Sequence, residues 1–407
     1  MSMLEIHFAG PAKRQARRCS HAASLHSSAP MQNRIHASFS RLCLLAAAFA
    51  AGVASLSGCG GVSFDPRPSA DIAPEKLFMF TAVQAPAPAT GVTALRVDLG
   101  RRLFYEQHLS VNGSVSCNSC HNLGAYGADT GRAVSIGHDK KPGGRNSPTV
   151  YNAGLQFAQF WDGRAATLAE QAAGPIMNPV EMGMPGPEAV LVYLHSSPDY
   201  TKQFKQAYPG VKDPVVMDNV TDAIATFESG LITPSRWDKY LQGDTNALSS
   251  EEKKGLRVFL RSGCASCHAG KGLGGNSYQK LGASRDWPNQ DSDVGRMAIT
   301  HHSADKLYFK VPLLRNVTET GPWFHDGHVK TIDEAVRLMG HFQTGRSLSD
   351  NDMRSIVAFL GSLKGDIPHQ YIQPPSAIAP PSKAALTPGS TRSLTARFDP
   401  TTWKEGQ

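Results

Sequence analysis

The sequence predicts a mainly α-helical fold made of two similar domains, and two repeated features lead to this prediction. The pattern Cys-x-x-Cys-His occurs at Cys117–His121 and again at Cys264–His268, 147 residues later. The segments behind these motifs align without a gap at an offset of 164, with seven identities and one conservative change over 25 positions. The identities include the pairs Pro148/Pro312, Asn152/Asn316, Asp162/Asp326, Gly163/Gly327, Thr167/Thr331 and Glu170/Glu334. Such agreement favours an internal duplication over convergence.

The two motifs have the spacing that attaches c-type haem. Two thiols form thioethers with the haem vinyl groups, and the adjacent His supplies a nitrogen to iron. A thioredoxin-like pair or half of a zinc site would not explain a His after each second Cys. The residues predicted to hold two covalent haem c groups are therefore Cys117, Cys120, His121, Cys264, Cys267 and His268.

A short amphipathic segment precedes each motif, Leu99–Phe104 before the first and Lys254–Phe259 before the second. Both are expected to be helices. The second is expected to begin at Ser249, where Glu252 is placed for a capping box. Each half is thus predicted to be a cytochrome c-like helical domain with little strand and one covalent haem.

The domain boundary is placed near Thr233–Pro234, so that the two domains span residues 96–233 and 234–365. Residues 59–95 are rich in Ala, Pro and Gly, which predicts a flexible tether. Residues 366–407 hold seven prolines and no long apolar period, which predicts a Pro-rich tail.

An export leader is expected at residues 1–58. The apolar run 42–57 follows two arginines, as in a secretory signal, and is too short for a confident transmembrane helix. It ends in Leu56–Cys59, which resembles a bacterial lipobox, where the Cys is lipidated and the chain is cut before it. Cys59 is therefore expected to carry a lipid anchor, and the Gly that follows favours tethering to the outer membrane on the periplasmic side. An ordinary signal peptide is the alternative.

Cysteine use and charge agree with this organisation. Four of the seven Cys belong to the haem motifs, Cys19 and Cys43 lie in the leader, and Cys59 lies in the lipobox, so no pair is left for a disulfide. The leader holds six of the 41 basic residues and one of the 34 acidic residues, so its removal lowers the net charge from +7 to +2. A nearly neutral protein gives no support to nucleic-acid binding.

The alignment of the halves predicts two inequivalent irons. Met339 follows the expected helix Ile332–Leu338, where a thioether can ligate the second iron and raise its reduction potential. The first half has Pro175 at the same offset, and Pro cannot ligate. Helix packing is the other common role of a Met, and His341 is a competing ligand. An iron without a permanent sixth ligand is where chemistry can occur.

Three polar residues are expected near the first iron. Glu181 could move a proton between the oxygens of a bound peroxide, and Gln171 could hold the reacting group by a hydrogen bond. A surface carboxylate is the alternative for Glu181. His138 lies in a Gly-containing loop and could be a reversible sixth ligand, although a loop His is more often solvent-facing.

Several segments together resemble the bacterial dihaem cytochrome c peroxidases of the periplasm. They cover roughly residues 95–365, in the order found in that family, and are highly specific as a set. The segments are Ser135–His138, Arg145–Val150, Phe160–Ala165, Asn178–Gly183, Leu314–Val317, Phe324–Gly327 and Glu334–Gly340.

The resemblance implies a role for each haem. The first, held by His121, would be the low-potential peroxidatic centre, where hydrogen peroxide is reduced to water. The second, held by His268 and Met339, would be the high-potential centre that receives electrons. His138 would cap the first iron in the fully oxidised enzyme and leave it once the second haem is reduced.

The resemblance also implies further site residues and partners. Glu181 and Gln171 would be the distal acid–base and amide residues, and Trp161 would lie between the haems, which is compatible with packing in the core. Asn146, Thr320 and Pro322 would bind calcium, the last two through backbone carbonyls, and oxygen ligands suit that ion. The electron donor would be a small cytochrome c or a cupredoxin, and the protein would be a homodimer.

Two other functions compete with the peroxidase. One is a dihaem oxidase that acts on a protein or another organic substrate; in those methylamine-utilisation relatives a Tyr replaces the Met ligand, whereas Met339 is present here. The other is a non-enzymatic electron carrier with both irons permanently closed. Glu181, Gln171 and the loss of the Met at Pro175 argue against the carrier.

Overall fold

The computed structural model describes residues 72–288 and 290–376, all within one compact unit. The predicted leader, the Cys59 anchor and the tail after residue 376 lie outside the described residues. Within the described ranges, no helix has the length and apolar character needed to cross a membrane.

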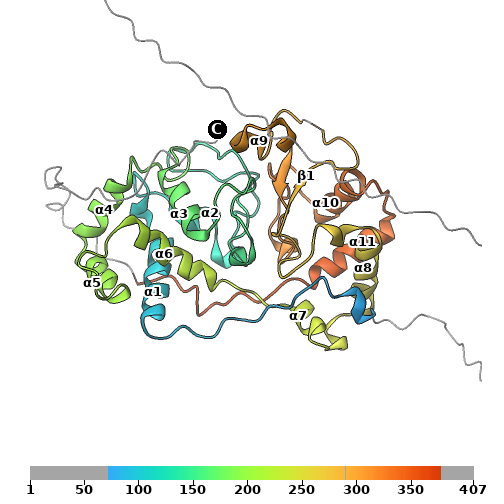
Figure 1. Cartoon of the computed structure of the whole chain (residues 1–407), viewed down its shortest axis with the longest axis horizontal. Coiled ribbons are helices and arrows are strands. Elements are labelled where there is room, and N and C mark those ends of the chain that lie inside the picture. The colour runs from blue at the N-terminus through green and yellow to red at the C-terminus, as the bar shows by residue number, and fades with distance from the viewer. Residues whose placement is uncertain (1–71, 289, 377–407) are drawn as a thin grey trace, which may run out of the picture. The chain divides into compact units, whose positions relative to one another are not determined.

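The described chain is mainly helical, as predicted (Figure 1). The helices of the first half are α1 Gly91–Tyr105, α2 Cys117–Cys120, α3 Leu168–Met177, α4 Pro187–Ser196, α5 Pro198–Ala207 and α6 Met217–Ser229. Those of the second half are α7 Arg236–Leu241, α8 Ser250–Arg261, α9 Met297–Thr300, α10 Ile332–Leu338 and α11 Asp350–Gly361. The strands β1 Tyr278–Lys280 and β2 Tyr308–Lys310 pair antiparallel, with Tyr278 opposite Lys310.

Short turns connect these elements. The 3₁₀ turns are Pro74–Lys76, Gln107–Leu109, Leu123–Ala125, Ala153–Leu155, Thr245–Ala247, Cys264–Ser266, Ser303–Asp305 and Val317–Glu319, and a π-helical turn, Met339–Gln343, follows α10. The expected helix over residues 332–338 is confirmed as α10. The capping box of Ser249 and Glu252 at the start of α8 is confirmed as well.

Each half is built around one pair of crossing helices, α1 with α6 and α8 with α11. In the first pair a Cβ on Gly100 would lie 1.9 Å from the carbonyl oxygen of Ala223. In the second pair a Cβ on Gly255 would lie 1.8 Å from that of Ser355. Only Gly permits so close an approach of two helices, so both halves use the same device to form their cores.

A hydrophobic core surrounds each helix pair. Leu103, Phe104 and Phe227 are fully buried in the first core, and Trp237 and Leu256 are fully buried in the second. Burying each such side chain contributes about 1.5–3 kcal/mol. These two cores hold the segments that carry the haem motifs.

The turns that the alignment pairs also have matching local structure. Thr167 caps α3 and Thr331 caps α10, each accepting a hydrogen bond from the backbone N–H three residues later. Asn152 and Asn316 both adopt left-handed backbone conformations, with φ of 61° and 60°. Their side-chain amides both donate to the Thr233 hydroxyl, at 2.8 and 2.9 Å.

Part of the predicted tether, residues 72–83, packs against the second half. Ile72 and Phe80 are buried in the second core, where the Phe80 ring lies 5.2 Å from that of Trp237. The Val83 N–H donates to Asp238 Oδ1 at 2.7 Å. Because the surrounding composition is rich in Ala and Pro, these few anchoring side chains gave no periodic signal. Figure 1 shows this segment in blue, running beside α7 before it reaches α1.

The segment after α11 returns to the first half. Ile372 belongs to the first core, and the Tyr371 ring stacks on Phe227 with centroids 5.2 Å apart. The Tyr371 hydroxyl also donates to the carbonyl oxygen of Phe227 at 2.8 Å. The described part of the predicted tail, residues 366–376, therefore belongs to the folded unit.

Candidate active site

The first haem motif lies on α2, a single helical turn that begins after Ser116. Ser116 and Ser119 form a capping box, in which the Ser116 N–H donates to Ser119 Oγ at 2.9 Å. The turn brings both thiols to one side, because residues three apart are neighbours on a helix. His121 follows, and its Nδ1 lies 3.3 Å from the carbonyl oxygen of Gly127. A ring held through Nδ1 leaves Nε2 available to iron.

The second motif has a similar arrangement on the 3₁₀ turn Cys264–Ser266. The preceding Gly263 has φ of 84°, a left-handed conformation that favours glycine. His268 Nδ1 lies 3.0 Å from the carbonyl oxygen of Leu273, so this ring is also held through Nδ1. Both His rings therefore have the Nδ1 contact that is common for metal-ligating His.

The surroundings of both motifs fit covalent haem. Burial raises the pKa of the Cys117 thiol and raises that of Cys264 to about 11. Burial also lowers the pKa of His121 and of His268. Apolar surroundings suit uncharged thioethers and the neutral imidazole that binds iron. Each motif thus fits a haem c.

The proposed Met ligand lies at the start of the π-helical turn after α10. Met339 is partly buried and is the C-cap residue of α10. The competing His341 is exposed, and Arg285 contacts both its Nδ1, at 3.0 Å, and its carbonyl oxygen, at 2.9 Å. Pro175, which the alignment pairs with Met339, lies inside α3. Ligation by Met339 stays a prediction.

Glu181 lies close to the first haem motif. Its charge contributes to raising the pKa of the Cys117 and Cys120 thiols, which places the carboxyl near both. Burial raises the pKa of Glu181 itself, while Arg164 and a 3.0 Å hydrogen bond from Asn178 oppose this shift. A raised pKa makes the carboxyl a better proton acceptor, which suits a residue that takes up and returns a proton.

Helix α3 connects Gln171 to Glu181. Gln171 lies partly buried on this helix, and Asn178 is its C-cap. The Asn178 carbonyl oxygen accepts hydrogen bonds from the N–H groups of Glu181, at 3.0 Å, and Gly183, at 2.9 Å. This tight turn fixes the carboxyl relative to the helix that carries the amide.

His138 lies against the same turn. Its Nε2 is 3.0 Å from the carbonyl oxygen of Pro179, and its N–H donates to the carbonyl oxygen of Glu181 at 2.8 Å. Gly183 leaves room for the ring, because a Cβ there would lie 2.4 Å from His138 Nε2. A ring nitrogen that donates to a carbonyl cannot bind iron at the same time. In this conformation the Nε2 atom of His138 is therefore occupied by the hydrogen bond to Pro179 and does not serve as an iron ligand.

Trp161 joins the two halves. Its indole Nε1 donates to the carbonyl oxygen of Asn146 at 2.8 Å, and its own carbonyl oxygen accepts from the Lys310 N–H in β2 at 2.7 Å. The ring lies edge-on to His325, with centroids 6.4 Å apart. Trp161 is thus bonded to both halves, and its place between the haems stays a prediction.

The predicted calcium ligands come from two neighbouring segments. The Asn146 N–H donates to the carbonyl oxygen of His325 at 2.7 Å, which brings Asn146 to the loop that contains Thr320 and Pro322. Asn146 Nδ2 donates to the carbonyl oxygen of Ala133 at 3.0 Å, which leaves Oδ1 as the remaining side-chain acceptor. Calcium binding by Asn146, Thr320 and Pro322 stays a prediction.

Sequence reasoning missed a charged network between the halves. Arg145 donates to Asp293 Oδ2 at 2.6 Å and to Asp162 Oδ2 at 2.7 Å. Nearby, the Lys310 ammonium contacts Gln156 Oε1, and burial lowers the pKa of Lys310 to about 8. No local pattern marks Asp293, because its partner lies 148 residues away.

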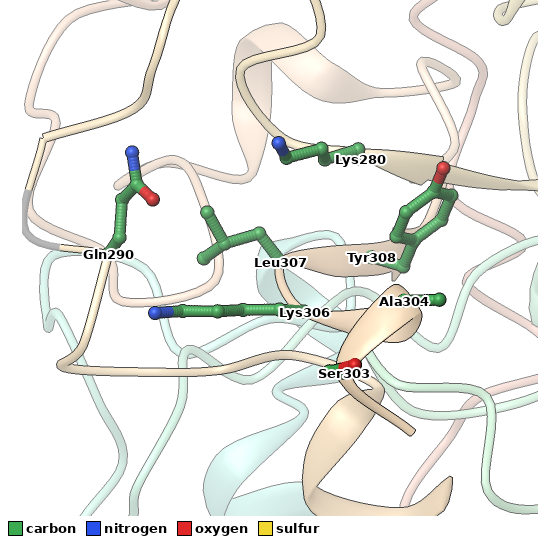
Figure 2. A pocket seen from close by; sticks show the side chains of 7 residues that line it. All are labelled: Lys280, Gln290, Ser303, Ala304, Lys306, Leu307 and Tyr308. Atoms are coloured by element: carbon green, nitrogen blue, oxygen red, sulfur yellow. The ribbon is translucent and has the colours of Figure 1, made fainter. Parts of the chain in front are cut away.

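A pocket of about 370 Å³ lies in the second half. Its lining residues are Lys280, Gln290, Ser303, Ala304, Lys306, Leu307 and Tyr308. Figure 2 shows the Lys280 and Lys306 side chains with Leu307 between them. Asp291 already pairs with Lys306, at 2.6 Å, and none of the predicted site residues lines the pocket.

Comparison with known proteins agrees with this site. Residues 94–246 match the family model of the di-haem cytochrome c peroxidases, and residues 252–364 match that of cytochrome c. The cytochrome c551 peroxidase of Nitrosomonas europaea is 45% identical over 287 residues, which cover 70% of this chain and 85% of that protein. The chain belongs to the di-haem cytochrome c peroxidase family. It is a peroxidase, and membership of this family implies two haem c groups.

Other relatives of the di-haem peroxidase extend the comparison. The cytochrome c peroxidase Ccp of Escherichia coli is 46% identical over 67% of this chain and 58% of that protein. The methylamine utilization protein MauG of Methylorubrum extorquens is 33% identical over 68% of this chain and 80% of that protein.

Solved structures share the fold of this peroxidase. A MauG-like protein associated with microbial copper homeostasis matches 71% of this chain and 97% of its own, with a TM-score of 0.63 and 27% identity. The diheme peroxidase BthA from Burkholderia thailandensis covers 75% of this chain and 93% of its own, with a TM-score of 0.56. At 22% identity, the second likeness shows the fold alone.

Proposed function

We propose that this peroxidase reduces hydrogen peroxide to water at the first haem, with electrons that a small donor protein delivers to the second. The difference between the surroundings of the two haem motifs carries the proposal. Near the thiols of the first motif lies Glu181, a carboxyl whose pKa burial raises. The second half offers Met339 as an iron ligand, where the first half has Pro175. One half is therefore equipped for proton transfer and the other for electron transfer.

In this mechanism the first haem, when bound, supplies the iron at which peroxide is cleaved. Glu181 would take a proton from one peroxide oxygen and return it to the leaving oxygen. The hydrogen bond from Asn178 orients the carboxyl for both steps. Gln171, on α3, holds the reacting oxygens by a hydrogen bond.

His138 controls access to the first iron in this proposal. The ring nitrogen that now donates to Pro179 would turn to the iron in the fully oxidised protein. Reduction of the second haem would return the ring to the turn at Pro179–Gly183, where the hydrogen bonds described above hold it. The peroxide site would then be open.

His268 and Met339 would hold the second haem, which would supply the site where electrons enter. Trp161 lies on the path to the first haem, because it bonds to both halves. A calcium ion held by Asn146, Thr320 and Pro322 would keep the halves in this arrangement, and oxygen donors of this kind suit it.

We further infer that the two halves arose by internal duplication, which the matched turns and helix crossings support. The donor would be a small cytochrome c or a cupredoxin. The protein would act in the periplasm, as a homodimer, with its lipid anchor at Cys59.

A second candidate function is oxidation of a protein or another organic substrate, which the 33% identity to a MauG protein favours. Met339 counts against it, because those relatives are expected to carry Tyr as the second-haem ligand. Both functions would use the same open first haem, so an activity assay separates them by the substrate that is consumed.

Steady-state peroxide consumption tests the proposal, with reduced cytochrome c as donor and calcium present. The fully oxidised and half-reduced proteins should be compared. Rapid turnover by the half-reduced protein supports the peroxide mechanism. Slow turnover in both states, with both haems six-coordinate by absorption spectroscopy, would overturn it.

A further inference from the structure

Helix α6 buries a carboxyl that the peroxide mechanism does not use. Glu228 is 3% exposed. Its Oε2 has no hydrogen-bond partner among residues 72–288 and 290–376. Burying such a group without a partner is costly, so the position needs an explanation beyond stability. Burial alone raises the pKa of Glu228 to about 8.

Glu228 lies next to the attachment point of the first haem. Its charge raises the pKa of the Cys117 thiol, second only to the effect of burial. The sulfur of Cys117 bonds to the porphyrin once haem is attached. A charge near this sulfur is therefore within electrostatic reach of the porphyrin and its iron.

The second half provides an internal comparison for this position. Built Cβ atoms on Gly100 and Gly255 lie 2.9 Å from the Cβ atoms of Phe227 and Phe359, respectively. The next residue on each helix, Glu228 or Leu360, is 3% exposed in both cases. The two halves therefore bury a carboxyl beside the first haem motif and an apolar side chain at the matching place beside the second.

Charged groups on the neighbouring elements do not neutralise Glu228. Burial is the whole cause of the raised pKa of Glu228. The ionisable groups of α1 and α3 therefore add nothing to this shift and do not oppose it. These groups are Arg96, Asp98, Arg101, Arg102 and Tyr105 on α1 and Glu170 on α3. Tyr371, from the segment after α11, donates to the carbonyl oxygen of Phe227 instead.

We propose that Glu228, when ionised, lowers the reduction potential of the first haem, and that proton binding by Glu228 is linked to the redox state of this haem. A carboxylate close to the porphyrin favours the oxidised iron, which carries one more positive charge. Glu228 would take up one proton from solvent for the one electron that the first haem receives from the second. Charge near the first haem is then balanced. Leu360 offers no such group to the second haem.

This inference rests on the proposed attachment of the first haem, and its test does not depend on turnover. Spectroelectrochemical titration of the purified dihaem protein gives both haem potentials in one sample. It should be repeated over two pH units on either side of the Glu228 pKa of about 8. The variants are Glu228→Gln, which keeps the shape, and Glu228→Leu, which copies the second half.

In the wild type we expect the first-haem potential to fall as the pH rises, by up to about 59 mV for each tenfold fall in proton activity. Both variants should have a higher first-haem potential above the Glu228 pKa and a flatter pH profile. The second-haem potential should stay unchanged and shows that each variant is folded.

Unchanged first-haem potentials and pH profiles in both variants would overturn the inference. If peroxide turnover fails while the potentials shift as expected, the proposed function fails and the inference stands. If turnover is rapid and the potentials do not shift, only the role of Glu228 is lost.

Discussion

Asn152 and Asn316 donate hydrogen bonds from their side-chain amides to the same hydroxyl, that of Thr233. Their separation of 164 residues equals the offset at which the two halves align. The carbonyl oxygens of the same amides accept from the N–H groups of Thr233, at 3.0 Å, and Gly365, at 2.9 Å. Equivalent residues of the two halves thus share one buried anchor, at the residue where the domain boundary was placed.

Replacing this anchor should destabilise the protein as a whole. Thr233→Val keeps the shape of the fully buried side chain but removes the acceptor of both amides. Each amide left without a partner costs about 1–3 kcal/mol, so we expect the free energy of unfolding to fall by at least about 2 kcal/mol. Denaturant titration followed by circular dichroism measures this change.

The exposed Thr245 supplies the control for this experiment. Thr245→Val should change the free energy of unfolding by no more than about 0.5 kcal/mol. Equal shifts in the two variants would contradict a shared anchor at Thr233.

Local patterns predicted much of the fold and of the haem sites. The helix over residues 332–338 and the capping box at Ser249 follow from residue type and spacing, and both are present as expected. The Cys-x-x-Cys-His motifs marked both haem sites, because attachment requires those residues within one turn of chain. Alignment of the halves singled out Met339 and Pro175.

Pairings between distant residues were not predictable in this way. Phe80 precedes the first half in the sequence but packs in the second core, and Tyr371 follows the second half but packs on Phe227 in the first. No short stretch of sequence indicates these contacts. The pair of Arg145 with Asp293 and the buried Glu228 are similar cases. Their significance depends on burial and on partners far away in the chain.

Loss of the distal carboxyl should abolish most of the peroxide turnover. Glu181→Gln keeps the hydrogen-bonding shape but cannot carry the proton, so we expect kcat to fall by about 10²- to 10⁴-fold. Steady-state assays with reduced cytochrome c and half-reduced enzyme measure this loss. Glu188→Gln, at an exposed position on α4, is the matched control and should keep full activity. Similar activity in both variants would exclude Glu181 as the proton carrier.

Removal of His138 should relieve the need for prior reduction. If its ring caps the first iron in the oxidised state, His138→Ala should turn over peroxide as isolated, whereas the wild type should require half-reduction. Absorption spectra of the oxidised proteins should show a high-spin first haem in the variant only. His302→Ala changes an exposed His and should behave as the wild type. A variant that still requires reduction would argue against capping by His138.

The Arg145 network should make stability depend on pH in the acid range. Burial acts to raise the pKa of Asp293, but the Arg145 guanidinium outweighs it and the net pKa lies below the ordinary value of 3.8. A carboxyl with a lowered pKa stabilises the fold fully above its unfolded-state value and loses this effect as the pH falls through the folded-state value. Wild-type stability should therefore decline as the pH drops below about 3.8.

Arg145→Gln tests this dependence directly. At neutral pH the variant leaves Asp293 buried without its main cation, at a cost of about 3–5 kcal/mol, although Asp162 keeps Arg164 at 2.8 Å. As the pH falls, Asp293 is protonated in the variant before it is protonated in the wild type. The difference in the free energy of unfolding between the two proteins should therefore become smaller. Urea midpoints at a series of pH values measure it. Arg132→Gln, which changes an exposed arginine, should follow the wild type throughout. If the difference in the free energy of unfolding does not change with pH, the variant is destabilised by lost packing and not by the charge of Asp293.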